Sequence, residues 1–213
     1  MIYELRIYTV KPGTLPAFVK LNSEVAYKIR GDNHGELVGC WTTEIGPLNQ
    51  FFHLWSYPSL AERETLRAGL PKNPAWTQEY TSKTGTFMVK QENVLLNLDE
   101  EVGFNPVEGT GHVYELRRYR GLPGELNSWT SLFKGALTAR QQYSKIVGLW
   151  TSEIGGLNVA AHLWAYNDLN HRADVRAKAL QDPIWAGFVP KGSAHLAEME
   201  STILLPTPIS PLQ

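Results

Sequence analysis

The sequence predicts an α+β fold built from two similar units, each with the element order βαββαβ. Two observations predict it. The segment GCWTTEIGPLN from Gly39 to Asn49 is nearly repeated as GLWTSEIGGLN from Gly148 to Asn158, and short alternating and helical apolar patterns surround both copies. A repeat of about 110 residues has the size of a small domain, and it is longer than solenoid or propeller repeats.

Repeated residues align the two halves. Tyr3 corresponds to Tyr114, an offset of 111 residues, whereas His53 corresponds to His162, an offset of 109. The second half therefore lacks two residues between these points, and we expect the gap near residues 31–34. The expected domains are repeat 1 (1–98), a linker (99–111), repeat 2 (112–205) and a proline-rich tail (206–213).

The elements of the first half follow from hydrophobic periodicity. Residues 2–9 alternate as a strand does, Pro12-Gly13 ends that strand, and the apolar positions from Leu15 onward have helical spacing. A short glycine-bearing connection then joins two strands as an antiparallel hairpin. The remaining expected elements are strands 36–45 and 50–57, a helix over 59–68, a looser segment around Pro74 and Trp76, and a strand over 86–96. In the second half they are strands 145–154 and 159–166 and a helix over 167–179.

This order is that of the ferredoxin-like fold, in which two helices cover one face of a four-stranded antiparallel sheet. Alternation along the third strand places His53 and Trp55 on one side and Phe52 and Leu54 on the other. Because small and aliphatic side chains suit packing under helices, we expect the His53 side to be free of helices. It should also carry Glu4, Arg6, Tyr8, Tyr57 and Trp41. An aromatic face of this kind needs cover, so we expect the two units to pack sheet to sheet with a pocket between them.

Composition and charge exclude several classes of partner. The net charge is −1 and no run of Lys or Arg occurs, so neither nucleic acid nor an anionic membrane is an expected partner. No signal core, transit helix or long apolar stretch is seen, which makes a cytoplasmic location the default expectation. Cys40 is the single cysteine, so no internal disulfide and no cysteine-cluster metal site is expected. We expect no bound metal and no tightly held cofactor; a homodimer is an open alternative.

Longer motifs point to a family. In both halves Tyr-Glu-Leu-Arg-x-Tyr precedes Pro-Gly, and Gly-x-Trp-Thr-x-Glu-Ile-Gly-x-Leu-Asn precedes His-Leu-Trp-x-Tyr. This pattern resembles the NIPSNAP family of the dimeric α+β barrel superfamily. The resemblance implies two ferredoxin-like units paired face to face within one chain. Relatives in the superfamily include cofactor-free monooxygenases, muconolactone-type isomerases, haem-degrading enzymes and haem-binding dehydratases, so no single reaction is implied. Without a targeting segment the chain is more similar to compact bacterial members.

His162 is the main candidate for chemistry, because an imidazole can act as acid, base or ligand near neutral pH. A partly buried histidine among tryptophans should have a lowered pKa and remain a neutral proton acceptor. Arg117 and Tyr119 are expected beside it. The corresponding and weaker candidates are His53, Arg6 and Tyr8. For the two histidines we favour a structural role, and for Arg6 with Glu4 a structural ion pair.

Differences between the halves indicate where a ligand would fit. Phe51-Phe52 becomes Ala160-Ala161, which should open space beside His162 and leave His53 the less exposed histidine. The expected ligand-binding residues are Trp150, Trp164, Ala160, Trp41 and Trp55.

Arg63 and Arg67, repeated as Arg172 and Arg176, have the i, i+4 spacing of two residues on one helix face, and we expect them to be solvated charges on the helix surface.

Three functions remain open from the sequence. The chain is an enzyme without a cofactor, similar to a monooxygenase or isomerase, or a binder of a small aromatic or hydrophobic acid; it is an interaction module with a solid interior; or it binds haem or a metal through a histidine. Fold alone does not choose among them.

Overall fold

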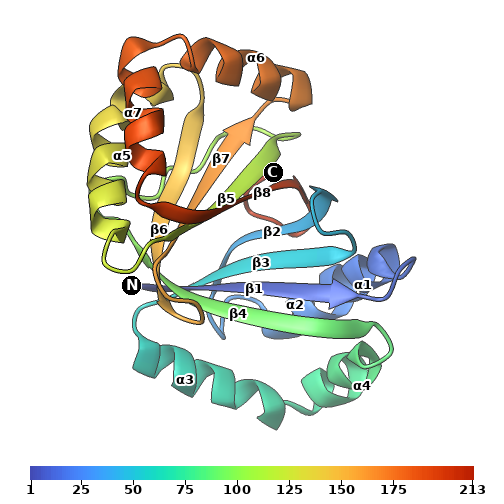
Figure 1. Ribbon diagram of the computed structural model, residues 1–213. Coiled ribbons are helices and arrows are strands. Elements are labelled where there is room, and N and C mark those ends of the chain that lie inside the picture. Colours follow the sequence, from blue (N-terminus) through green and yellow to red (C-terminus); the bar gives the residue numbers. More distant parts are fainter. The chain divides into compact units, whose positions relative to one another are not determined.

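The computed structural model describes residues 1–213, which divide into two compact units. The first unit comprises Met1–Leu96 together with Leu205–Gln213, and the second comprises Asn97–Leu204. The C-terminal segment therefore packs with the beginning of the chain. Each unit has the expected βαββαβ order (Figure 1).

The first unit contains a four-stranded sheet in the order β4-β1-β3-β2. Its strands are β1 (Ile2–Val10), β2 (Glu36–Ile45), β3 (Gln50–Tyr57) and β4 (Met88–Leu98). Strands β1 and β2 both pair antiparallel with β3, so that Arg6 and Cys40 lie on either side of His53.

The second unit repeats this sheet in the order β8-β5-β7-β6. Its strands are β5 (Val113–Gly121), β6 (Lys145–Ile154), β7 (Val159–Tyr166) and β8 (Leu196–Pro206). Arg117 and Leu149 lie on either side of His162, the same register as in the first unit. The hairpins also share one turn geometry, since Asn49 and Asn158 both have a positive φ, 58° and 57°. Asparagine tolerates this left-handed conformation better than most residues.

The helices of the two units differ in regularity. In the second unit they are α5 (Leu126–Gln141), α6 (Leu169–Ala179) and α7 (Pro183–Ser193), and α5 and α7 lie side by side over the sheet (Figure 1). In the first unit the helical segments are α1 (Leu15–Leu21), the π-helix η1 (Asn22–Ala26), α2 (Tyr27–Arg30), α3 (Leu60–Gly69), the 3-10 helix η2 (Leu70–Lys72), the π-helix η3 (Trp76–Thr81) and α4 (Ser82–Thr84).

Side-chain caps start several of these helices. The Ser59 hydroxyl accepts a hydrogen bond from the Glu62 amide at 3.1 Å, and Asp182 accepts bonds from the amides of Ile184 and Trp185. Pro183, at the first helical position after this aspartate, has no amide to satisfy and a φ suited to the helix. The segment around Pro74 and Trp76, expected to be loose, is also helical.

The prediction of which residues share a sheet face is confirmed for β1 and β3, because Glu4, Arg6 and Tyr8 pair directly with Trp55, His53 and Phe51. The prediction that this face is free of helices is wrong. Phe51, Trp55 and Tyr57 pack in one core cluster with Phe18 of the first helix, and His162 contacts the Trp129 and Phe133 rings of α5. Trp41 and Trp150 lie on the opposite face, since they pair with Phe52 and Ala161.

The physical reason is that both faces of each sheet are buried. Phe52 and Leu54, on the face away from the helices, are as inaccessible as Phe51. Alternation therefore separates two apolar faces without identifying the one under the helices. The helices bring aromatic side chains of their own, so the aromatic face of the sheet packs against them.

Candidate functional site

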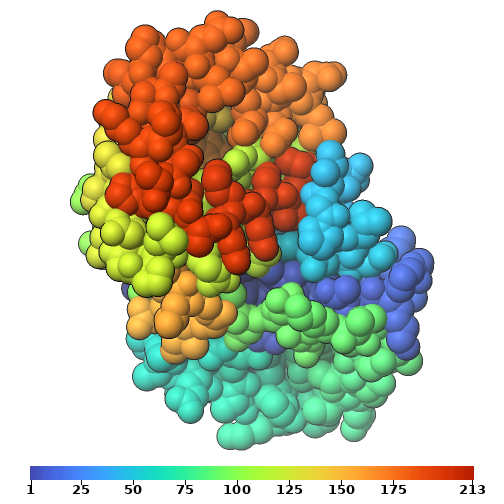
Figure 2. Space-filling model, in the orientation of Figure 1, coloured from blue at the N-terminus to red at the C-terminus, as the bar shows by residue number.

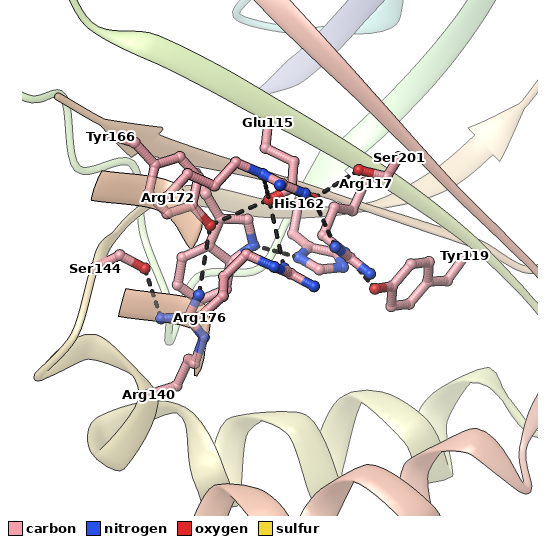
Figure 3. Close-up of polar contacts among 11 residues, drawn as sticks. Glu115, Arg117, Tyr119, Arg140, Ser144, His162, Tyr166, Arg172, Arg176 and Ser201 are labelled. Atoms are coloured by element: carbon pink, nitrogen blue, oxygen red, sulfur yellow. Dashed lines mark hydrogen bonds and ion pairs between the residues drawn. The ribbon is translucent and has the colours of Figure 1, made fainter. Parts of the chain in front are cut away.

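A buried carboxylate forms the centre of the polar cluster in the second unit. Glu115 has a fully buried side chain and receives hydrogen bonds from Arg117 at 2.6 Å, Arg172 at 2.8 and 3.0 Å, and Ser201 at 2.6 Å. Tyr166 donates a fifth hydrogen bond at 3.2 Å (Figure 3). Burial alone would raise the pKa of the Glu115 carboxyl. The hydrogen bond from Arg172 and the charges of the neighbouring arginines outweigh burial and hold this pKa far below its usual range.

Arginines outnumber the carboxylate in this cluster. Arg176, one turn after Arg172 on α6, reaches Glu115 only at 3.5 Å and keeps a third of its side chain exposed. Arg140 of α5 is buried over the Trp164 ring and bonds Ser144 and the Tyr166 hydroxyl. Four guanidinium groups and one carboxylate leave a net charge of +3 at neutral pH. The cluster can therefore hold a further anion.

His162 has one nitrogen bound and one nitrogen free. Its Nδ1 accepts a hydrogen bond of 2.7 Å from the Trp164 indole, which can only donate, so the ring proton is on Nε2. The Nε2 atom is buried and has no hydrogen-bond partner. Desolvation first, and the charges of Arg117, Arg140 and Arg176 in addition, hold the pKa of His162 well below 6.5. The neutral ring is thus a hydrogen-bond donor and not the proton acceptor that the sequence suggested.

A cavity of about 150 Å³ lies over this cluster, between the sheet and the helices of its own unit. In Figure 3 the labelled side chains lie between the strands and two helices. Figure 2 shows the surface of this unit hollowed between the atoms of α6 and α7 and those of β8. The lining comprises the charged or polar Arg117, Tyr119, Arg140, His162 and Arg176, and the aromatic Trp129, Phe133, Trp164, Trp185 and Phe188, with smaller contributions from α7 and β8. A buried cavity of about 150 Å³ is enough for a benzene ring.

The first unit contains the same cluster. Glu4 is fully buried and bonds Arg6 at 2.7 Å, Arg63 at 2.6 Å and Arg67 at 3.5 Å. Burial opposes the shift, but the Arg63 hydrogen bond and the surrounding charges lower the pKa of Glu4 to about 2. The Nδ1 atom of His53 accepts from Trp55 at 2.7 Å, and its Nε2 atom is also buried and unpartnered. A second cavity, of about 220 Å³, lies over this cluster.

The structure brings most of the predicted site residues together. His162, Arg117, Tyr119 and Trp164 line the cavity of the second unit, and His53, Arg6, Tyr8 and Trp55 line that of the first. The short contact from Arg117 to the Tyr119 hydroxyl links two of them. Trp41, Trp150 and Ala160 line neither cavity. The expected ion pair between Glu4 and Arg6 is confirmed.

The expected difference between the cavities is reversed. Ala160, the counterpart of Phe51, is fully buried and packs in one core cluster with the rings of Trp129 and Phe133. The second unit therefore has the smaller cavity. His162 is also the less exposed histidine, at 3% against 7% for His53.

Sequence reasoning missed the helical arginines. Arg63, Arg67, Arg172 and Arg176 are not solvated helix charge, because each contacts a buried glutamate. Their recurrence at the same i, i+4 spacing in both halves, alongside a strand glutamate, was the signal that could have found them.

Haem or metal ligation does not fit these histidines. A ligating histidine normally donates its second ring nitrogen to an acceptor, which leaves the ligating nitrogen unprotonated. Here Trp164 and Trp55 donate to Nδ1, so the nitrogen left over carries the proton. No group of three or more His, Cys, Asp or Glu side chains is arranged to hold a metal ion.

No helix combines the length and apolar character needed to span a membrane.

Comparisons with known proteins match the chain over its whole length. The family model named NIPSNAP matches twice, at residues 3–99 and 114–211. Protein NipSnap homolog 2 of Homo sapiens is 36% identical over 219 residues, covering 100% of this chain and 75% of that protein. Protein NipSnap homolog of Dictyostelium discoideum is 31% identical over 210 residues, covering 96% and 87%.

A solved structure has a similar fold at low identity. A Fusobacterium nucleatum protein named "putative monooxygenase" is 10% identical, with a TM-score of 0.71 over 97% of this chain and 92% of that one. At this identity the likeness shows the fold alone. It confirms the predicted α+β class, the dimeric α+β barrel with two βαββαβ units.

Proposed function

The chain belongs to the NIPSNAP family, and we propose that the cavity of its second unit binds a small aromatic acid as the anion. One observation carries this proposal. A cavity lined by aromatic rings has an arginine cluster with spare positive charge and a buried, unpartnered N–H of His162 at its wall. An apolar pocket with a few convergent polar groups is the usual form of a small-molecule site.

The charged groups divide into two roles. Arg117 and Arg172 make the short bonds that neutralise Glu115, so they hold the cluster together. Arg176 has only the long 3.5 Å contact and remains partly exposed at the cavity. A carboxylate entering the cavity would therefore find Arg176 as its principal charged partner and the His162 N–H as a further donor.

The aromatic lining accounts for the other part of the ligand. Trp129, Phe133, Trp185 and Phe188 contact one another at ring-centroid distances of 4.8–6.4 Å, which makes a wall of ring faces and edges. The volume suits one six-membered ring. A single-ring aromatic acid satisfies both the ring wall and the arginines.

The same groups would favour chemistry on an anion. Fixed N–H donors and guanidinium groups stabilise negative charge that develops on an enolate or phenolate. Glu115 is held ionised by its arginines and His162 has its acceptor nitrogen occupied, so neither group is free to remove a proton from a substrate. A reaction at this site would thus start from a substrate that is already ionised at the reacting group, as in the cofactor-independent oxygenation of an acidic aromatic compound by O2.

Isothermal titration with benzoate and with the neutral benzamide tests the proposal. We expect benzoate to bind and Arg176→Gln to weaken it by about 10- to 100-fold, the value of about 1.5–3 kcal/mol for a hydrogen bond to a charged group. Benzamide should bind far more weakly in both proteins.

Two variants serve as controls. Arg67→Gln removes the corresponding arginine of the first unit, and Arg120→Gln removes an exposed arginine that pairs with Glu198. Arg120→Gln should not change benzoate binding, and Arg67→Gln should not change the component of benzoate binding that Arg176→Gln weakens. Equal affinities for benzoate and benzamide, or equal losses in Arg176→Gln and Arg120→Gln, would contradict the proposal.

A further inference from the structure

The first unit has extra residues in the two helical segments that cover its cavity. Phe18 corresponds to Trp129 at an offset of 111, but Arg30 corresponds to Arg140 at 110. The equivalence of these arginines is structural, since each stacks over the tryptophan of its unit, at 3.4 and 4.5 Å from the ring centroid. One extra residue therefore lies between Phe18 and Arg30, where the π-helix η1 is found.

The second helical segment repeats the pattern. Trp76 corresponds to Trp185 at an offset of 109, whereas Tyr80 and Phe188, which pack on these tryptophans at 4.5 and 4.9 Å, are 108 residues apart. The extra residue falls in the π-helix η3. A π turn has i→i+5 hydrogen bonds and so holds one more residue than an α turn; such turns occur frequently at functional sites. The regular α5 and α7 replace both segments in the second unit.

The two π turns carry polar side chains into the cavity. Asn22 stands at the position of Phe133, and Tyr80 at that of Phe188. Both line the cavity and are more than nine-tenths buried. The Tyr80 hydroxyl donates to Asn22 Oδ1 at 3.1 Å, and Asn22 Nδ2 donates to the Phe18 carbonyl at 2.9 Å. One N–H of Asn22 and the lone pairs of the Tyr80 oxygen remain for a ligand.

Other groups extend the polar lining. The Nε2 atom of His53 and the Nε atom of Arg30 are buried without a partner, and both residues line the cavity. Gln91 stands at the position of Met199. Arg67, like Arg176, contacts its glutamate only at 3.5 Å; it also hydrogen-bonds Tyr57, and its partly exposed guanidinium group lines the cavity, where it can meet an anion. The first cavity thus has the anion chemistry of the second, more volume and an added set of neutral hydrogen-bonding groups.

We propose that the cavity of the first unit is a second binding site, selective for an aromatic acid that is larger than the ligand of the second unit and carries a ring hydroxyl. The acid group meets Arg67 and the His53 N–H. The ring hydroxyl donates to the Tyr80 oxygen and accepts from the free N–H of Asn22. The site shares the anion chemistry of the proposed function but occupies different residues, so each can fail alone.

Titration with 4-hydroxycinnamate and cinnamate, which differ only in the ring hydroxyl, tests this site. We expect the hydroxylated acid to bind about tenfold more tightly, as one added buried hydrogen bond allows. Arg67→Gln should weaken 4-hydroxycinnamate binding by at least about tenfold, and its counterpart Arg176→Gln should leave it within about twofold. Tyr80→Phe should remove the preference for the hydroxyl while cinnamate still binds.

The outcomes separate the two sites. If Arg176→Gln and not Arg67→Gln abolishes 4-hydroxycinnamate binding, the second site is refuted while the benzoate site stands. Equal binding of the two cinnamates, or a preference that survives Tyr80→Phe, also refutes it. Circular dichroism and thermal unfolding establish that each variant is folded; if Arg67→Gln does not fold, Tyr80→Phe, which removes a single oxygen atom, decides alone.

Discussion

The two units hold the same carboxylate–arginine cluster on their sheets and cover it with different helices. Glu4 and Glu115 occupy the same place, bond arginines from the same strand and helix, and lie beside histidines bound in the same way to tryptophan. Above them, the second unit has regular helices with aromatic rings, and the first has π turns with Asn22 and Tyr80. After duplication, the carboxylate–arginine cluster on the sheet has been kept and the helical segments above it have changed. This is expected if the cluster provides affinity for anions and the helical segments provide selectivity.

The glutamates should be the most sensitive positions in both units. Replacing Glu115 with Gln leaves Arg117, Arg172 and Arg176 without their counter-charge in a buried site, and loss of one partner of a buried ion pair costs about 3–5 kcal/mol. We expect a loss of this size in the free energy of unfolding, measured by urea denaturation followed by tryptophan fluorescence.

Glu4→Gln is the matched change. It should cost as much or slightly less, because Glu115 has an additional bond from Ser201. If both variants lose less than about 1 kcal/mol in the free energy of unfolding, the carboxylate–arginine clusters do not stabilise the two units in the way proposed.

Exchanging one aromatic ring between the units tests how the helices pack on each sheet. Ala160→Phe places a phenyl ring where Trp129 and Phe133 already pack, so it should destabilise the protein by about 1–3 kcal/mol. The double variant Ala160→Phe, Trp129→Phe restores the Phe51 and Phe18 pair of the first unit, which pack edge to face at 5.2 Å. We expect it to recover most of the lost free energy of unfolding in thermal or urea denaturation.

If the double variant is no more stable than the sum of the single changes predicts, Trp129 does not compensate for Ala160. The smaller cavity of the second unit would then need another explanation.

The histidines should respond to pH in the same way in both units. Desolvation and nearby arginines hold the folded pKa of His53 and His162 well below 6.5, so below pH 6.5 the unfolded chain binds protons that the folded chain does not. Stability is therefore complete above pH 6.5 and falls as the pH decreases, by up to about 1.4 kcal/mol per pH unit for each histidine. His53→Gln and His162→Gln should each reduce the slope of the free energy of unfolding against pH by the contribution of one proton, as measured by urea denaturation between pH 7 and 5. Unequal changes in slope would show that the two imidazoles are in different environments.

Much of the fold could be predicted from sequence, because strand alternation and hairpin turns are local. Strands β2, β3, β6 and β7 have the predicted bounds residue for residue. The helical segment around Pro74 and Trp76 was missed, since proline commonly ends a helix and the preceding Asn73, whose side chain accepts from the Ala75 amide, was not recognised as a cap. The side of the sheet under the helices could not be predicted, because side chains on both faces are apolar and buried.

The site could be predicted only in part. The histidine, tyrosine and strand arginine were found by alternation along β1, β3 and their counterparts. The helical arginines were missed because a charged i, i+4 pair looks solvated until a buried glutamate is known to face it. The larger cavity was assigned to the wrong half, since Ala160 was considered without Trp129. Of the two extra residues expected near residues 31–34, one lies instead in the π-helix η1.

The packing of the C-terminal segment has a consequence for dissecting the protein. The backbone of Cys40 on β2 is bonded by residues near the other end of the chain: its amide donates to the Ser210 hydroxyl at 2.9 Å, and its carbonyl accepts from the Thr207 amide at 2.9 Å. A gene fragment encoding only the first sequence repeat would leave these backbone groups of β2 without their partners. The duplication boundary in the DNA and the boundary between folding units are therefore not the same, and the first unit can be expressed whole only if its last nine residues are rejoined to it, for example by circular permutation.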